Sequence, residues 1–227
     1  MGHFYAYLYR LRLIDRWSLM RNTTRESAAE HSFQVALLTH ALCSIARDVY
    51  GKPVDADRAV VLALFHDATE VITGDVPTPV KHHNPAILAA MREVEGLAAD
   101  RLLGMVPPAL RATYRPLIEP RAGDAADAGL WPWIKAADKL DAYLKCVVEL
   151  AAGNREFAVA RRQLEEPLRR SPLPEVRYFL EHFAPSFERT LDELTEGAEG
   201  VDGVALTAPG TSSDPPPERS PGGPAGG

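Results

Sequence analysis

Residues 60–72 read VVLALFHDATEVI and predict the centre of the fold. Apolar residues lie on nearly every side of the expected helix, and such a helix is normally buried. His66, Asp67 and Glu70 interrupt the run, and at about 100° per residue they share one face. Buried charges are costly unless they are paired or bind a metal. The stretch therefore indicates either half of a metal site or a salt-bridged cluster in a helical core.

The composition favours a globular cytoplasmic enzyme or binding protein. The 227 residues are 46% hydrophobic, and the net charge is −6 with a pI near 5.7. This charge argues against a protein that coats a nucleic-acid polymer, which usually presents a basic face. Neither a signal peptide nor a membrane-length apolar run is present, so we expect no membrane association. Cys43 and Cys146 lie in apolar stretches and are interpreted as reduced core residues.

Hydrophobic periodicity and helix-capping signals predict an all-α chain without strands. A domain is expected over residues 1–196, and a disordered Gly/Pro-rich tail over 197–227, where 8 of 31 residues are Gly and 6 are Pro. Two prolines are expected to exclude a helix from the loop at 75–79, and 121–127 is expected to be a second loop. The expected helices cover residues 4–13, 27–50, about 57–73, 85–104, 108–118, 132–152, 156–170 and 175–194.

Two further residues in apolar stripes carry metal-ligand chemistry. His31 lies in the first turn of a helix that begins at the capping box Ser27–Glu30. It is either a ligand or a core histidine with its hydrogen bonds satisfied. Asp138 lies at the edge of the stripe of the 132–152 helix, as a ligand or as a solvated carboxylate. With His66 and Asp67 they would form a site suited to Mn, Fe, Co, Ni or Zn.

Residues outside this group have both a functional and a plain interpretation. Arg16 and Trp17 adjoin each other, either as an anion-binding guanidinium beside an aromatic wall or as a surface Arg beside a core Trp. The loop containing Asp75 and Thr78 leaves the helix end that carries Glu70, so these side chains are expected near the site. The adjacent pair His82-His83 is interpreted as solvated, because neighbouring helical residues point about 100° apart.

The ordered set of motifs resembles the bacterial HD-domain 5′-deoxynucleotidases, within the HD-domain metal-dependent phosphohydrolases. The His…His-Asp…Asp pattern is weak by itself, whereas the whole set across about residues 4–195 is specific. The sequence departs from the family pattern at Ser18, where Pro is expected, and at the charged Lys139 and Asp141. The matching motifs are residues 11–17 (LRLIDRW), 30–32 (EHS), 65–70 (FHDATE), 73–81 (TGDVPTPVK), 137–138 (AD) and 142–146 (AYLKC).

The resemblance implies an HD-domain helical bundle that removes the 5′-phosphate from 2′-deoxyribonucleoside 5′-monophosphates. It implies one divalent transition metal on His31, His66, Asp67 and Asp138. Further implied roles are phosphate binding by Arg16, nucleoside contacts by Trp17 and by Asp75, Val76, Pro77 and Thr78, and catalysis by Glu70, Asp75 and Arg16. It also implies a homodimer, which exposed-looking aromatics such as Trp131 and Tyr178 would favour.

Two other functions remain open at this point. One is hydrolysis of nucleoside triphosphates to release tripolyphosphate or pyrophosphate on the same fold, with a specialised nucleoside pathway as one setting for this activity. The other is a non-catalytic nucleotide-binding HD domain. The presence of every ligand type together with Glu70 argues against the second.

Overall fold

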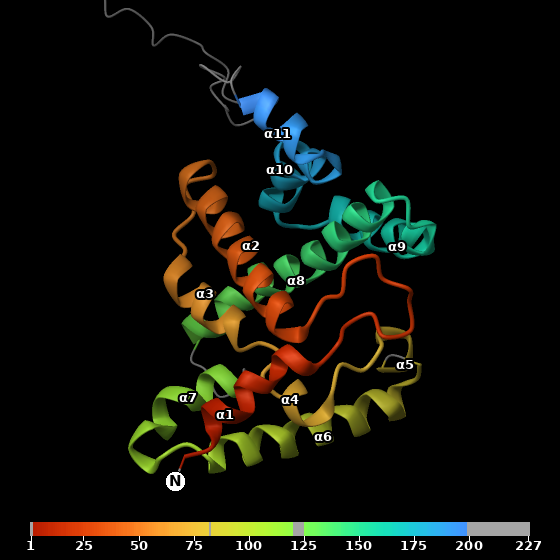
Figure 1. The fold of residues 1–227 in the computed structure, drawn as a ribbon. Helices are drawn as coiled ribbons and strands as arrows, with labels where there is room; N and C mark the ends of the chain where they lie inside the picture. The colour runs from red at the N-terminus through yellow and green to blue at the C-terminus, as the bar shows by residue number, and fades with distance from the viewer. Residues whose placement is uncertain (1, 82, 120–124, 199–227) are drawn as a thin grey trace, which may run out of the picture.

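The computed structural model describes residues 2–81, 83–119 and 125–198, and within them the chain is helical without a β-sheet (Figure 1). A single isolated bridge pairs Asp15 with Ser27. The all-α prediction is confirmed. The α-helices are α1 Phe4–Leu8, α2 Ala28–Asp48, α3 Ala56–Leu64, α4 Glu70–Thr73, α5 Thr78–Lys81, α6 Pro85–Gly104, α7 Arg111–Ile118, α8 Ala125–Ala151, α9 Ala158–Arg169, α10 Pro174–His182 and α11 Leu191–Ala198, with 3-10 helices at Tyr9–Leu13, Pro108–Leu110, Arg155–Phe157 and Ala184–Glu188.

Two hydrophobic clusters hold these helices together. In the larger cluster α2 packs against α3 and α8, α9 packs against α8, and α10 packs against α2 and α9. The smaller cluster joins α1, α6 and α7 to Ala68 in the turn after α3. Phe65 and Tyr114 pack against both clusters. The segment that carries His66 and Asp67 therefore lies at the boundary between the two clusters.

The predicted helix ends follow the local signals. Ser27 and Glu30 form the reciprocal capping box at the start of α2, and the Asp55 side chain accepts the Arg58 N–H at the start of α3. Asn84 caps α6, with Pro85 in its first turn. Gly74 ends α4 with a positive φ of 73°, a conformation that costs little without a Cβ.

The expected continuous helix through residues 60–72 is wrong. Helix α3 ends at Leu64, and residues 65–69 form turns before α4 begins at Glu70. The prediction that this helix is buried on all sides is also wrong, because Val61 is 37% exposed and Leu64 is 42% exposed. Tight i to i+3 bonds replace the helical pattern, from the His66 N–H to the Ala63 carbonyl and from the Ala68 N–H to the Phe65 carbonyl.

Three other expected boundaries differ from the structure. The prolines at 77 and 79 do not exclude a helix, because one turn at Thr78–Lys81 places Pro79 where its missing N–H needs no partner. Helix α8 begins at Ala125, inside the expected loop at 121–127. The expected helix over 175–194 is divided by Pro185, which lies in the 3-10 helix between α10 and α11.

The predictions for the cysteines, for Tyr178 and for the tail have different outcomes. Cys43 and Cys146 are buried free thiols, as expected. Tyr178 is only 5% exposed, so it does not supply the exposed aromatic surface expected of a dimer contact. No described helix combines the length and hydropathy needed to cross a membrane. Of the expected tail, residues 199–227 lie outside the part of the chain that the structure describes.

Candidate metal centre

His31 lies in the first turn of α2, where its ring is completely buried. Its Nδ1–H donates to Asp141 Oδ2 at 2.7 Å. Its Nε2 lies 3.4 Å from Asp67 Oδ2 and 3.3 Å from Asp138 Oδ1. One ring nitrogen therefore carries a hydrogen for Asp141, and the other faces two carboxylates from separate segments.

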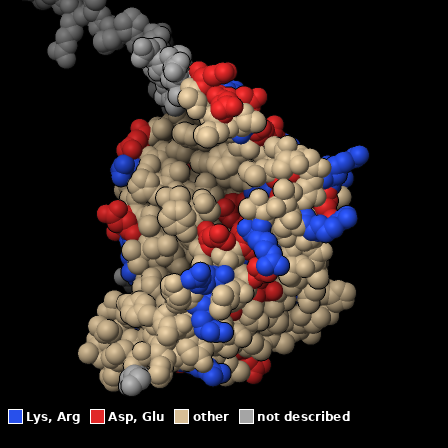
Figure 2. All heavy atoms as spheres, viewed as in Figure 1, with Lys and Arg blue, Asp and Glu red and all other residues tan. Residues whose placement is uncertain are grey.

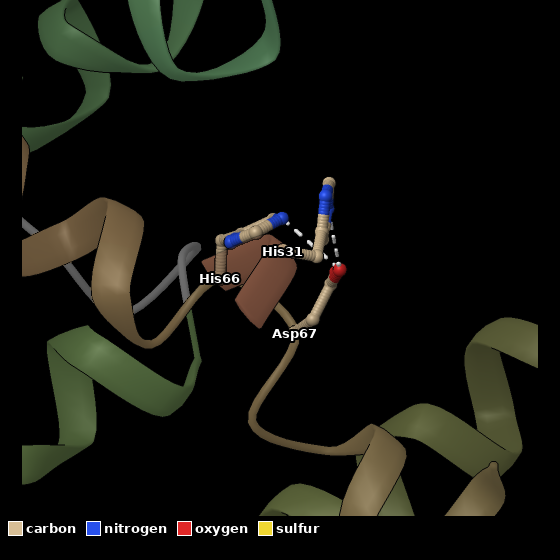
Figure 3. A group of neighbouring side chains, drawn as sticks. All are labelled: His31, His66 and Asp67. Atoms are coloured by element: carbon tan, nitrogen blue, oxygen red, sulfur yellow. Dashed lines mark ion pairs between the residues drawn. The ribbon is translucent and has the colours of Figure 1, made fainter. Parts of the chain in front are cut away.

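The turn after α3 brings His66 and Asp67 to the same point. His66 Nδ1–H donates to the Ala63 carbonyl at 2.7 Å, which turns Nε2 to within 3.0 Å of Asp67 Oδ2. Figure 3 shows both imidazole rings directed at that carboxylate. On a regular helix two adjacent residues would diverge by about 100°. The break in the helix is therefore what allows both side chains to serve one site.

The groups of the centre are buried and strongly affect one another's pKa values. The Nε2 atoms of His31 and His66 are buried without hydrogen-bond partners. Burial opposes protonation of His31, but Asp138, Asp141 and Asp67 outweigh it and raise its pKa to about 11. Burial also opposes ionisation of Asp67, yet the two histidines hold its pKa well below the ordinary value. Two imidazole nitrogens facing two carboxylates fit a divalent transition metal.

Arg16 lies directly beside this centre. Its Nε donates to Glu26 Oε1 at 2.8 Å, and its NH1 lies 3.8 Å from Asp67 Oδ2. Both the Arg16 and Glu26 side chains are largely buried, at 12% and 14% exposed. Glu26 thus fixes the Nε edge of the guanidinium, while NH1 faces the carboxylate of Asp67 at the centre. Figure 2 shows acidic side chains at the middle of one face, with Lys and Arg side chains around them.

Two further carboxyl groups, those of Glu70 and Asp75, follow Asp67 in the sequence. Burial, with the charges of Asp67 and Asp75, raises the pKa of Glu70 to about 8. Glu70 Oε2 is buried without a partner. Asp75 is half-buried and close enough to act electrostatically on both Glu70 and Arg16. Glu70 is therefore a candidate for proton transfer beside the centre, with Asp75 as its neighbour.

The residues expected to contact the nucleoside are Trp17 and the segment from Asp75 to Thr78. The Trp17 ring packs on the Phe157 ring at a centroid distance of 5.3 Å, next in sequence to Arg16. Val76 and Pro77 are half-buried, and Thr78 is exposed at the start of α5. They continue the segment that leaves Glu70 through Gly74. His83 is exposed, as expected, and His82 lies outside the described residues.

Two carboxylates that contact this group are not among the residues predicted for the site. Asp141 binds His31, and Glu26 binds Arg16. Asp141 stands three residues after Asp138, so it lies on the same side of α8, and that spacing could have identified it. Glu26 precedes the α2 cap in an extended segment, and only the tertiary contact reveals its partner.

Comparison with known proteins defines the family. Residues 3–187 match the family described as 5′-deoxynucleotidase YfbR-like. The chain belongs to that family. The relatives of this YfbR-like chain include the 5′-deoxynucleotidase VV1113 of Vibrio vulnificus, 45% identical over 86% of this chain and 98% of the relative. The 5′-deoxynucleotidase YfbR of Escherichia coli is 47% identical, over 86% of this chain and 96% of that protein.

Solved structures share the fold of this YfbR-like chain. An HD-domain phosphohydrolase from Listeria innocua superposes with a TM-score of 0.69 at 22% identity, covering 87% of this chain and 97% of that one. The cyanophage S-2L HD phosphohydrolase DatZ, solved with dA and one catalytic Zn²⁺ ion, gives a TM-score of 0.56 at 23% identity, with coverage of 80% and 96%. The expected HD-domain helical bundle is confirmed.

Proposed function

We propose that this chain hydrolyses 2′-deoxyribonucleoside 5′-monophosphates to deoxynucleoside and phosphate. The observation that carries the proposal is the convergence of two buried, unpartnered imidazole nitrogens on Asp67, with Arg16 beside them. This arrangement combines sites for a metal and for a phosphate. The 5′-deoxynucleotidases that match at 45–47% identity support the choice of substrate.

The metal would be held by His31 Nε2, His66 Nε2 and the carboxylates of Asp67 and Asp138. A divalent Mn, Fe, Co, Ni or Zn ion bound there supplies a Lewis acid that polarises the phosphate and lowers the pKa of water. The Zn²⁺ named for the cyanophage phosphohydrolase is compatible with this donor set. A cation next to Asp67 also favours the ionised form of Glu70, whose pKa is otherwise raised.

Side chains around the proposed metal would bind the phosphate, transfer protons and contact the nucleoside. Arg16 binds the phosphate oxygens through the guanidinium edge that Glu26 leaves open. Glu70 Oε2, buried without a partner, accepts the proton of the attacking water. Asp75 would pass a proton from water to the leaving 5′-oxygen, which departs as the hydroxyl group of the deoxynucleoside. Trp17 and the segment from Asp75 to Thr78 contact the sugar and base.

The test is a panel of ribo- and deoxyribonucleoside mono-, di- and triphosphates with Mn, Co, Mg and Zn, and with a chelator. One orthophosphate released from deoxynucleoside monophosphates, only with metal, is the expected result. Release of tripolyphosphate or pyrophosphate from triphosphates would instead favour the triphosphohydrolase alternative. Binding of nucleotides without turnover under every metal would reject catalysis.

Removing a ligand tests the metal centre separately. Asp67→Ala and His66→Ala should lose most bound metal and most activity while far-UV circular dichroism still reports helix. Because truncation leaves other polar groups buried, a stability loss of about 1–3 kcal/mol is also expected. Full metal content and full turnover in Asp67→Ala would contradict the assignment.

We also propose that the chain is a homodimer. Phe33 and Leu37, one turn apart on the outer face of α2, are 54% and 52% exposed and offer apolar contact surface. Light scattering at micromolar concentration should give the mass of two chains. A monomer mass under these conditions would end this proposal without affecting the hydrolase proposal.

A further inference from the structure

Asp141 holds the side of His31 that faces away from the candidate ligands. It lies on α8, three residues after Asp138, and is 8% exposed. Its Oδ2 accepts the His31 Nδ1–H at 2.7 Å. With that hydrogen on Nδ1, a neutral His31 carries its lone pair on Nε2, which faces Asp67 and Asp138. The bond to Asp141 therefore selects the tautomer that can bind a metal at this point.

We propose that Asp141 is a positioning residue that orients His31 and tightens metal binding at the proposed centre. A carboxylate behind a metal-bound imidazole fixes the ring, sets its tautomer and makes the ligand nitrogen more basic. The inference rests on the proposed function, because it needs a metal at His31. It adds a residue to which the sequence motifs assign no role at the site.

The two histidines have different partners behind them. His66 donates its Nδ1–H to the neutral carbonyl of Ala63, whereas His31 donates to a carboxylate. Glu26 is the other carboxylate near His31 Nδ1, at 4.0 Å, but it is bonded to Arg16. The charge-assisted bond on His31 therefore comes from Asp141, and its loss should weaken metal binding.

The same contacts permit a competing arrangement. Ligand atoms of Glu26, His31 and Asp141 lie close enough together to hold an ion of their own. That ion would require His31 Nδ1 without its hydrogen, and so an imidazole bridging two metals. We infer a hydrogen bond here instead, which predicts one metal per chain.

The experiment measures metal affinity, because activity alone would not separate positioning from catalysis. Full-length protein is stripped with a chelator and titrated with Zn²⁺ and Co²⁺ against a competing chelator dye. Asp141→Asn keeps the shape and removes the charge. We expect a dissociation constant about 10–100-fold weaker than that of the wild type, with one metal per chain and an altered Co²⁺ absorption spectrum. The matched control is Asp100→Asn, an exposed carboxylate on α6, which should stay within about twofold of the wild type.

The outcomes separate the two proposals. If Asp141→Asn binds metal like the wild type while His66→Ala does not, the metal centre stands and the role of Asp141 is overturned. Two metals per chain, one of them lost in Asp141→Asn, would overturn it in favour of the second ion. A wild type that binds no metal would overturn the centre and the inference together. Should Asp141→Asn fail to fold by circular dichroism, the smaller neutral Asp141→Ser carries the same expectation.

Discussion

Trp17 occupies a backbone conformation that a bulky side chain rarely adopts, with φ at 55°. Such strain persists only where the surroundings enforce it, and it is typical of functional sites. Here the Met20 N–H donates to the Trp17 carbonyl at 2.9 Å, and the ring is held against Phe157. The sharp bend lets Arg16 point to the proposed metal centre while Trp17 turns to the ring of Phe157.

Trp17→Ala tests whether this residue selects the sugar. If the indole crowds the 2′ position, its removal should narrow the preference for deoxyribonucleotides over ribonucleotides without abolishing turnover. The measurement is the ratio of kcat/KM for a deoxynucleoside monophosphate and its ribo partner, in wild type and variant. Should both activities fall together at a constant ratio, Trp17 only packs, and selection would lie in the segment from Asp75 to Thr78.

Arg16→Lys tests the phosphate role. Lys keeps the charge but cannot bond Glu26 and the phosphate at once through a planar fork. We expect kcat to fall about 10–100-fold, equivalent to about 1.4–2.7 kcal/mol, with normal metal content. Arg25→Lys is the control, because the Arg25 side chain is 85% exposed. A kcat near that of the wild type would remove Arg16 from the phosphate site.

At the level of helices and loops, the Glu149 carboxylate near the end of α8 binds the backbone of the segment before α2. Glu149 is 1% exposed and accepts hydrogen bonds from the Thr23 and Thr24 N–H groups, from Lys145 and from Asn154. Burial alone would disfavour its charge, but these donors lower its pKa to about 2. The loop that carries Arg16 and Trp17 is thereby anchored to α8 and to the turn before α9.

Glu149→Gln should destabilise the protein at neutral pH by about 2–3 kcal/mol, because an amide cannot accept from all four donors. The sign of the pH dependence follows from the lowered pKa. The stabilisation by ionised Glu149 is complete above its unfolded pKa, near 4.5, and is lost as the pH falls toward 2. Thermal melting should therefore show a gap between wild type and variant that narrows from pH 5 to pH 2.

The control for this experiment is Glu166→Gln, whose carboxylate is 58% exposed and pairs with the exposed side chain of Arg170. An exposed pair of this kind contributes little, so the melting curves should nearly coincide with the wild type at every pH. A gap of constant size for Glu149→Gln across the acid range would mean that shape, and not charge, accounts for its effect.

In the whole molecule, the proposed site lies where several segments, distant in sequence, come together. His31 comes from α2, His66 and Asp67 from the turn between the two hydrophobic clusters, and Asp138 from α8. Arg16 reaches the site from the segment before α2. The backbone N–H of Arg16 donates to the Glu26 carbonyl at 2.9 Å, and this bond holds the segment in place. The centre therefore depends on helices that meet only when the core has formed.

Truncation after Ala198 should leave the melting temperature and kcat close to those of the full chain. The removed residues are rich in Gly and Pro and poor in large apolar side chains, so they have little hydrophobic surface to bury. Calorimetry and the phosphate-release assay provide the comparison. A clear drop in either quantity would mean that residues 199–227 pack against the domain or its site.

The amino-acid sequence predicts the helical class, the helix ends that local chemistry sets, and the residue types of the proposed centre. Capping by Ser27 and the positive φ of Gly74 depend on bonds within a few residues, which the sequence exposes directly. His31, His66, Asp67 and Asp138 were identified from motif order, because their spacing alone could not show that they meet.

The tertiary structure decided the geometry of the site. It ended α3 at Leu64, so that His66 and Asp67 point to one place, and it brought Asp141 to His31 across 110 positions of sequence. It also paired Glu26 with Arg16 in a segment without regular structure. Such contacts depend on how helices pack and on which polar groups burial leaves without water, and periodicity within one helix carries no information about either.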